Sequence, residues 1–210
     1  MNDPLDNTRM ARSHGAAGAA DASHTHGGET RPTAARTRQP ARSRSVQVRR
    51  LCTEQDIQAT WPLFLSLHRE SRYAGLRLSK SKRDAYLRNK MLAKPDRFAL
   101  LIGEWGHRPV GCLACAANRF LYGDDIIASC LSFYVLPACR KTLLGGRIAV
   151  KLLDAYRRWA VNRGAVEIQF HVTSGLNIAA TDRFLRRAGF GQTGGNYSLA
   201  LPARAGGEGR

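Results

Sequence analysis

The segment whose residue types most clearly indicate a chemical function is 133–148, which reads Phe-Tyr-Val-Leu-Pro-Ala-Cys-Arg-Lys-Thr-Leu-Leu-Gly-Gly-Arg-Ile. A helix that begins at a glycine pair presents unpaired N–H groups and a positive dipole end to a ligand that can approach closely. With Arg140, Lys141 and Arg147 beside it, this segment predicts a site for a pyrophosphate group. The alternative is an ordinary strand-to-helix turn with solvated basic side chains. A P-loop and a dinucleotide fingerprint are both excluded, because the glycines have neither spacing.

Two stretches resemble the GNAT acetyltransferase superfamily. Arg140-Lys-Thr-Leu-Leu-Gly145 is similar to the family's acetyl-CoA loop, Gln/Arg-x-x-Gly-x-Gly/Ala, although Leu143 stands where the first glycine is usual. The segment from Asn177 to Phe190 is similar to the family's Asn-x-x-Ala, Leu-Tyr and Gly-Phe helix and turn, with one additional residue between Asn177 and Gly189. The resemblance covers about residues 45–201 and leaves out both ends of the chain.

The resemblance implies that acetyl-CoA, as co-substrate, lies in a cleft where the strand ending at Leu136 splays from the strand ending at Thr173. Backbone groups near Tyr134 would pair with the pantetheine arm, the N–H groups from Lys141 onward would hold the pyrophosphate, and Asn177 would bind near the thioester. The cofactor-binding residues expected on this basis are Tyr134, Val135, Leu136, Arg140, Lys141, Thr142, Leu143, Leu144, Gly145, Gly146 and Asn177.

Acetyl transfer to an amine needs a base or a water chain to deprotonate the amine, and an acid to meet the departing thiolate. The family's usual acid is a tyrosine, and Leu185 occupies that position here, so Tyr134, Tyr197 or water would serve instead. His171 near the end of a strand and Glu70 near the end of a helix are the candidate bases. The alternatives are a hydrogen-bonded sheet residue for His171 and a solvated helix-end charge for Glu70.

The elements that must position these residues alternate along the chain. Residues 45–51 predict a strand, Thr53 with Asp56 opens a helix, and Ser79 caps a second helix that stops before Pro95. Residues 98–117 predict a hairpin, and strands are expected at 126–136, 166–173 and 196–201. Val166, Ile168, Phe170 and Val172 should share one face of their strand. Helices are expected from Gly145 to about residue 161 and from Asn177 to Arg187, the latter with Phe184 and Leu185 inward.

This order is that of an α/β chain with a mixed sheet. The resemblance implies a GNAT-like, mostly antiparallel central sheet flanked by helices, with strands splayed at the acetyl-CoA cleft. We expect a basic disordered tail at residues 1–44, an acyltransferase domain at 45–201 and a flexible tail at 202–210.

Composition adds constraints. The chain has 210 residues and a net charge of +17, of which +3 lies in residues 1–44. No segment is apolar enough for a membrane span or a signal peptide, so a cytoplasmic protein without a membrane partner is expected. The five scattered cysteines indicate buried thiols in a reducing compartment, and Cys112 and Cys115 should face opposite sides of a strand. The histidines at 14, 24 and 26 are better explained as a solvated segment than as a metal site, so no metal is expected.

The sequence therefore predicts an acetyl-CoA-dependent N-acetyltransferase in which an amine acceptor attacks directly in a ternary complex. The alternative is a catalytically weak domain of the same fold that binds CoA, or that binds nucleic acid through its basic surface. The acceptor would be a small molecule or a protein, and the enzyme a monomer or a homodimer.

Overall fold

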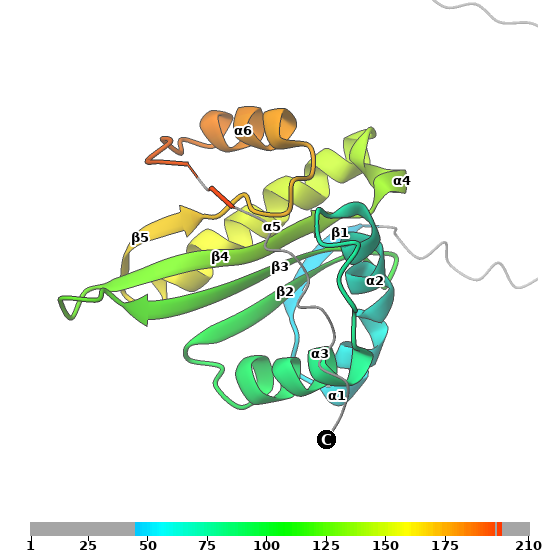
Figure 1. Ribbon diagram of the computed structural model, residues 1–210, viewed down its shortest axis with the longest axis horizontal. Helices are drawn as coiled ribbons and strands as arrows, with labels where there is room; N and C mark the ends of the chain where they lie inside the picture. Colours follow the sequence, from blue (N-terminus) through cyan, green and yellow to red (C-terminus); the bar gives the residue numbers. More distant parts are fainter. Residues whose placement is uncertain (1–44, 196, 199–210) are drawn as a thin grey trace, which may run out of the picture. The chain divides into compact units, whose positions relative to one another are not determined.

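The sheet is mixed and mostly antiparallel, as expected. The computed structural model describes residues 45–195 and 197–198. Within them one sheet has the order β1-β2-β3-β4-β5 (Figure 1). The strands are β1 (Val46–Arg50), β2 (Phe98–Trp105), β3 (Arg108–Arg119), β4 (Ile126–Val135) and β5 (Ala165–Phe170). Neighbours from β1 to β4 pair antiparallel, whereas β5 runs parallel to β4.

Four short helices cover one face of the sheet: α1 (Glu54–Ala59), α2 (Trp61–Glu70), α3 (Lys80–Tyr86) and the π-helix η1 (Leu87–Leu92). The Thr53 side chain accepts from the Asp56 N–H in the expected capping box, and Ser79 caps α3. The first expected helix is divided into α1 and α2 at Thr60. Pro62, at the start of α2, has no N–H with which to continue the ladder of α1.

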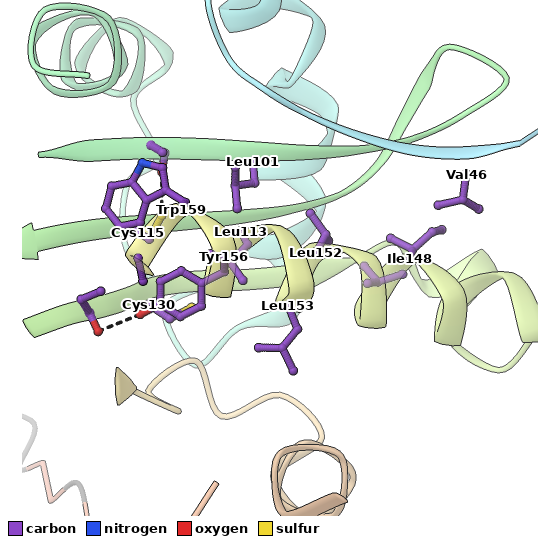
Figure 2. Close-up of a cluster of buried hydrophobic side chains, with 14 of the residues drawn as sticks. Val46, Leu101, Leu113, Cys115, Cys130, Ile148, Leu152, Leu153, Tyr156 and Trp159 are labelled. Atoms are coloured by element: carbon purple, nitrogen blue, oxygen red, sulfur yellow. Dashed lines mark hydrogen bonds between the residues drawn. The ribbon is translucent and has the colours of Figure 1, made fainter. Parts of the chain in front are cut away.

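The other face carries α5 (Leu143–Val161) and α6 (Ile178–Arg187), with the one-turn α4 (Pro137–Arg140) ahead of α5. Figure 2 shows the apolar stripe of α5, including Ile148, Leu152, Tyr156 and Trp159, packed against the strands. The expected start at Gly145 is wrong by two residues. Thr142 is the N-cap, and its side chain accepts from the N–H of Gly145, so the first turn contains Leu143.

The last described strand differs from its expectation in two ways. Ile126 pairs with Ala165 and Ile127 with Glu167, so Val166 is bulged out of the ladder and is 70% exposed instead of sharing the inner face. The strand also ends at Phe170, so residues 171–173 are loop. The expected tails at 1–44 and 202–210, and most of the expected strand 196–201, lie outside the described residues, and Tyr197 and Ser198 are not in a strand.

Alternating residues of β3 supply both cores. Cys112 packs among the residues beneath α1, α2 and η1, whereas Cys115 packs beneath α5. The two thiols therefore face opposite sides of the sheet, as expected. All five cysteines are free, and only Cys52 is exposed.

Candidate functional site

A cavity of about 450 Å³ lies where β4 and β5 part. Their parallel pairing ends at Cys130 and Phe170, but β4 continues to Val135. Leu131 is an unpaired bulge between β3 and β4 at this same point, which bends β4 away from its neighbour. Figure 1 shows the consequence: the chain leaves β5 toward α6 while β4 runs on to α4. The splayed strands expected from the sequence are therefore present.

The cavity has walls on both faces of the sheet. From the α5 and α6 face come Gly145, Gly146, Ala149, Ala180, Thr181 and Phe184. From the α2 face come Leu67, Ser71 and Tyr73. The split between β4 and the loop after β5, lined by residues 131–135 and 170–174, connects the two sides. A molecule lying along one face can thus present its end to a second molecule on the other.

The spacing between β4 and β5 at the start of this split is held by a residue that lies outside the cavity. The hydroxyl of Tyr156, on α5, lies 2.7 Å from the carbonyl oxygen of Ala128 on β4 and 3.2 Å from that of Gln169 on β5. Tyr156 is fully buried and does not line the cavity. One side chain therefore joins both strands just before they separate.

The N-terminus of α5 opens toward the cavity. The Thr142 side chain accepts a hydrogen bond from the N–H of Gly145, and the Thr142 carbonyl accepts one from the N–H of Gly146. The N–H groups of Leu143 and Leu144 therefore have no hydrogen-bond acceptor within the helix. A Cβ on Gly145 would lie 2.2 Å from the Cys139 carbonyl oxygen, so that glycine is required by the close packing of α4. A Cβ on Gly146 would meet nothing within 4 Å. Gly146 thus leaves the backbone open to a ligand.

Arg140 joins β4 to α2. Its Nε donates to the Val135 carbonyl oxygen at 2.6 Å, and its Nη1 and Nη2 reach the two carboxylate oxygens of Glu70 at 2.5 and 3.2 Å. The guanidinium also lies 4.7 Å from the centroid of the Tyr134 ring. Most of the donors of Arg140 are therefore already used by the protein, and the exposed Lys141 and Arg147 are the basic side chains free to meet an anion.

Tyr134 and Glu70 are joined by a hydrogen bond. The Tyr134 hydroxyl donates to Glu70 Oε1 and lies 2.7 Å from Ser66 Oγ. Burial alone would raise the pKa of Glu70, but hydrogen bonds from Arg140 and Tyr134 outweigh it and hold the pKa below its ordinary value. Burial, together with the bond to Glu70, raises the pKa of Tyr134 to about 12. Glu70 is thus a paired carboxylate and does not line the cavity, whereas Tyr134 does.

His171 and Asn177 both line the cavity. His171 is exposed in the loop that follows β5. Asn177 is the N-cap of α6 but has a left-handed backbone, with φ of 43°, and its side chain makes no capping bond. Its amide is therefore available to a ligand instead of to its own helix.

Phe184, not Leu185, faces the cavity from α6. Leu185 is 8% exposed in the core, as expected, while Phe184 stacks on Phe133 with ring centroids 5.9 Å apart and planes 9° from parallel. The sequence did not identify Phe184 or Tyr73 as lining the cavity, nor Ser66 as a hydrogen-bond partner of Tyr134. The only signal for Phe184 was its spacing of seven from Asn177.

Within residues 45–195 and 197–198, no helix combines the length and apolarity that a membrane crossing needs. In the same residues, no three His, Cys, Asp or Glu side chains gather in a group that could hold a metal ion. The histidines at 14, 24 and 26 lie outside this part of the chain.

Comparison with known proteins finds a matching family model and solved structures of similar fold. The family model described as "Acetyltransferase (GNAT) family" matches residues 61–190. No curated protein matches the sequence significantly. Similar solved structures include an aminoglycoside acetyltransferase from an uncultured soil metagenomic sample, with 16% identity, a TM-score of 0.57, and coverage of 75% of this chain and 99% of that one.

Two further solved structures are also similar to this chain. The ribosomal-protein-alanine N-acetyltransferase of Brucella melitensis biovar Abortus 2308 has 13% identity and a TM-score of 0.58, covering 75% of this chain and 99% of that chain. The aminoglycoside N-acetyltransferase AAC(6′)-Iy, in complex with CoA, has 16% identity and a TM-score of 0.58, covering 78% and 99%. At these identities the structures establish a shared fold.

Proposed function

This chain belongs to the acetyltransferase (GNAT) family and is an acetyl-CoA-dependent N-acetyltransferase, and we propose that the cavity between β4 and β5 is where its reaction takes place. The observation that carries the proposal is the end of the β4–β5 pairing at Cys130 and Phe170, beside the open N-terminus of α5. The alternative of a non-catalytic CoA-binding or nucleic-acid-binding module is not favoured by the family match.

Acetyl-CoA fits the α5 and α6 side of the cavity. Its pyrophosphate would lie at the N–H groups of Leu143 and Leu144, with Gly146 allowing the close approach and Lys141 and Arg147 supplying charge. The free edge of β4 at residues 132–135 would face the pantetheine arm, and the uncapped amide of Asn177 would bind near its thioester end. Arg140 would be a positioning residue, because it holds the end of β4 to α2.

The acceptor enters from the α2 side. A neutral amine attacks the thioester carbonyl carbon, so that a C–N bond forms, the C–S bond breaks, and CoA leaves as a thiolate that takes up a proton. His171 is placed to accept the proton that the amine loses, directly or through water, because its imidazole lines the cavity at the end of β5. Glu70 and Tyr134 are positioning residues in this proposal, since each is held by the other and the carboxylate is paired with Arg140.

The acceptor is proposed to be a small molecule. Two of the similar structures are aminoglycoside acetyltransferases and a third acts on a ribosomal protein's alanine, so the fold serves both sizes of acceptor. A cavity of about 450 Å³ with walls on both faces suits a small amine better than an extended peptide.

A binding assay and a kinetic assay test the proposal. Acetyl-CoA should raise the melting temperature of the full-length protein in proportion to its affinity, and a panel of small amines should be screened for CoA release. With an accepted amine, His171→Asn should lower kcat about 10²-fold while leaving KM for acetyl-CoA unchanged. His107→Asn, which alters an exposed histidine in the β2–β3 turn, is the matched control. No melting shift at saturating acetyl-CoA would overturn the proposed site.

A further inference from the structure

The acceptor side of the cavity is bordered by two loops without an acidic side chain, and the first of them carries two arginines. Residues 71–79 read Ser-Arg-Tyr-Ala-Gly-Leu-Arg-Leu-Ser, and residues 171–177 read His-Val-Thr-Ser-Gly-Leu-Asn. Arg72 and Arg77 are exposed. The first loop therefore brings two positive charges to this mouth, and the second brings no carboxylate to offset them.

Contacts between the loops place Arg72 beside the cavity. Its N–H donates to the Ser174 carbonyl oxygen at 2.9 Å. Gly175, with φ of +75°, packs against the Arg72 stem, since a Cβ there would lie 3.5 Å from Arg72 Cβ. The guanidinium carbon lies 5.2 Å from the ring centroid of Tyr73, which lines the cavity. Nη2 donates to Ser198 Oγ at 2.5 Å, so one arm of the guanidinium is engaged and its other donors can meet a ligand.

The cavity offers little to balance this charge. Among the described residues that line it there is no aspartate or glutamate, and Arg140 is the one arginine or lysine. Glu70, the carboxylate at the end of α2, is paired with Arg140 and lies outside the lining. A ligand with several ammonium groups would enter this site against a like charge, whereas a ligand with an anionic group would be attracted.

Resting on the proposed function, we infer that the acceptor is an amine that also carries an anionic group, a carboxylate or a phosphate, and that Arg72 selects it. A guanidinium fork matches either anion. The same positive field lowers the pKa of the acceptor's amine, because a nearby cation disfavours the charged form. It thereby increases the neutral, nucleophilic fraction in a site whose lining has no carboxylate to act as base.

The test is a set of acceptors that share a free amine and differ in charge, assayed by CoA release with the full-length enzyme. Alanyl-glutamate and phosphoethanolamine carry the two candidate anions, alanyl-lysinamide, which has no carboxylate, is the cationic match, and sisomicin is a polycation. We expect kcat/KM for alanyl-glutamate or phosphoethanolamine to exceed that for alanyl-lysinamide at least tenfold at low salt. The ratio should shrink at 0.5 M salt, because exposed charges are screened.

Charge-reversal variants test which side chain causes the preference for anionic acceptors. Arg72→Glu should reduce or invert the preference, while Arg108→Glu, an equal charge change at an exposed residue outside the cavity lining, should leave it intact. Since Arg72→Glu could disturb its loop, the charge-neutral Arg72→Gln, which should also reduce the preference, and the salt dependence of the unaltered enzyme are independent tests. Equal or greater activity on alanyl-lysinamide or sisomicin overturns the inference and leaves the proposed function standing. Acetyl-CoA binding without turnover of either anionic amine does the same, whereas absence of acetyl-CoA binding overturns both.

Discussion

Arg140 and Glu70, seventy positions apart in the sequence, form a two-bond ion pair that fastens the end of β4 to the end of α2. Both side chains are mostly shielded from solvent, at 22% and 28% exposed. Arg140, the first residue of the proposed cofactor loop, therefore holds the two sides of the cavity together. Lys141, its neighbour, has no such role and is exposed.

Substitutions at these neighbouring positions should separate the two effects. Arg140→Ala should lower the free energy of unfolding by about 1–2 kcal/mol, between the values typical of exposed and buried pairs, because it leaves Glu70 unpaired. Lys141→Ala should leave stability within about 0.5 kcal/mol and raise the Kd for acetyl-CoA severalfold. Urea denaturation and calorimetric titration measure both. Equal stability of the two variants would contradict this division of roles.

The ion pair also predicts a pH dependence of stability. Because the pKa of Glu70 is lower in the folded protein than its ordinary value of 4.5, ionised Glu70 stabilises the fold above that value. This contribution should disappear as the pH falls from 4.5 through the lower folded pKa. The difference in unfolding free energy between the wild type and Glu70→Gln should therefore be constant from pH 7 to about 5.5 and shrink below.

Urea denaturation at a series of pH values measures that difference. Glu167→Gln is the control, since that carboxylate is exposed and pairs with no cation among the described residues. A gap between wild type and Glu70→Gln that stays constant down to pH 3.5 would argue against the ion pair.

The register of α6 can be tested with two tyrosines. Phe184→Tyr should keep the stacking on Phe133 and add a hydroxyl at the cavity, so stability should change by less than about 1 kcal/mol and kcat should rise where thiolate protonation limits the rate. Leu185→Tyr should cost about 1–3 kcal/mol, because it forces a larger polar side chain into the core. Melting curves and steady-state kinetics distinguish the two. The reverse ranking of stabilities would mean that Leu185 faces the cavity.

The two glycines of the α5 N-terminus should respond in opposite ways. Gly145→Ala should destabilise the protein by more than 1 kcal/mol, because its Cβ would overlap the Cys139 carbonyl. Gly146→Ala should raise stability by up to about 1 kcal/mol, the usual gain for replacing an exposed helical glycine. It should at the same time weaken acetyl-CoA binding, measured by titration. Unchanged affinity in Gly146→Ala would remove the close approach of the ligand from the proposal.

Much of the fold could be predicted from the sequence because its signals are local. The capping box at Thr53, the Ser79 cap and the apolar stripe of α5 each act within a few residues. The start of α5 was misplaced because the glycine pair was taken as the first turn of the helix, whereas Thr142 supplies an N-cap three residues before Gly145. Val166 was misplaced because a bulge depends on the register with β4, which no pattern within one strand reveals.

The site was predictable only in part, for a related reason. The family resemblance located the cavity's α5 and α6 side, since those motifs are contiguous. The pairing of Glu70 with Arg140 and Tyr134 joins α2 to β4 across the sheet, so the sequence offered Glu70 as a free base. Whether Phe184 or Leu185 points inward depends on where α6 begins, which the left-handed Asn177 decides.

Tyr156 has a consequence for how this enzyme could diversify. Its buried hydroxyl sets the gap between β4 and β5 from a position that touches no reactant. Side chains on the lining can therefore be exchanged, in nature or in the laboratory, without altering the spacing of the two strands. Libraries randomised at residues 71–77 and 171–177 with Tyr156 held constant should contain a larger fraction of folded members than libraries that vary Tyr156, and so should be a productive starting point for new acceptor preferences.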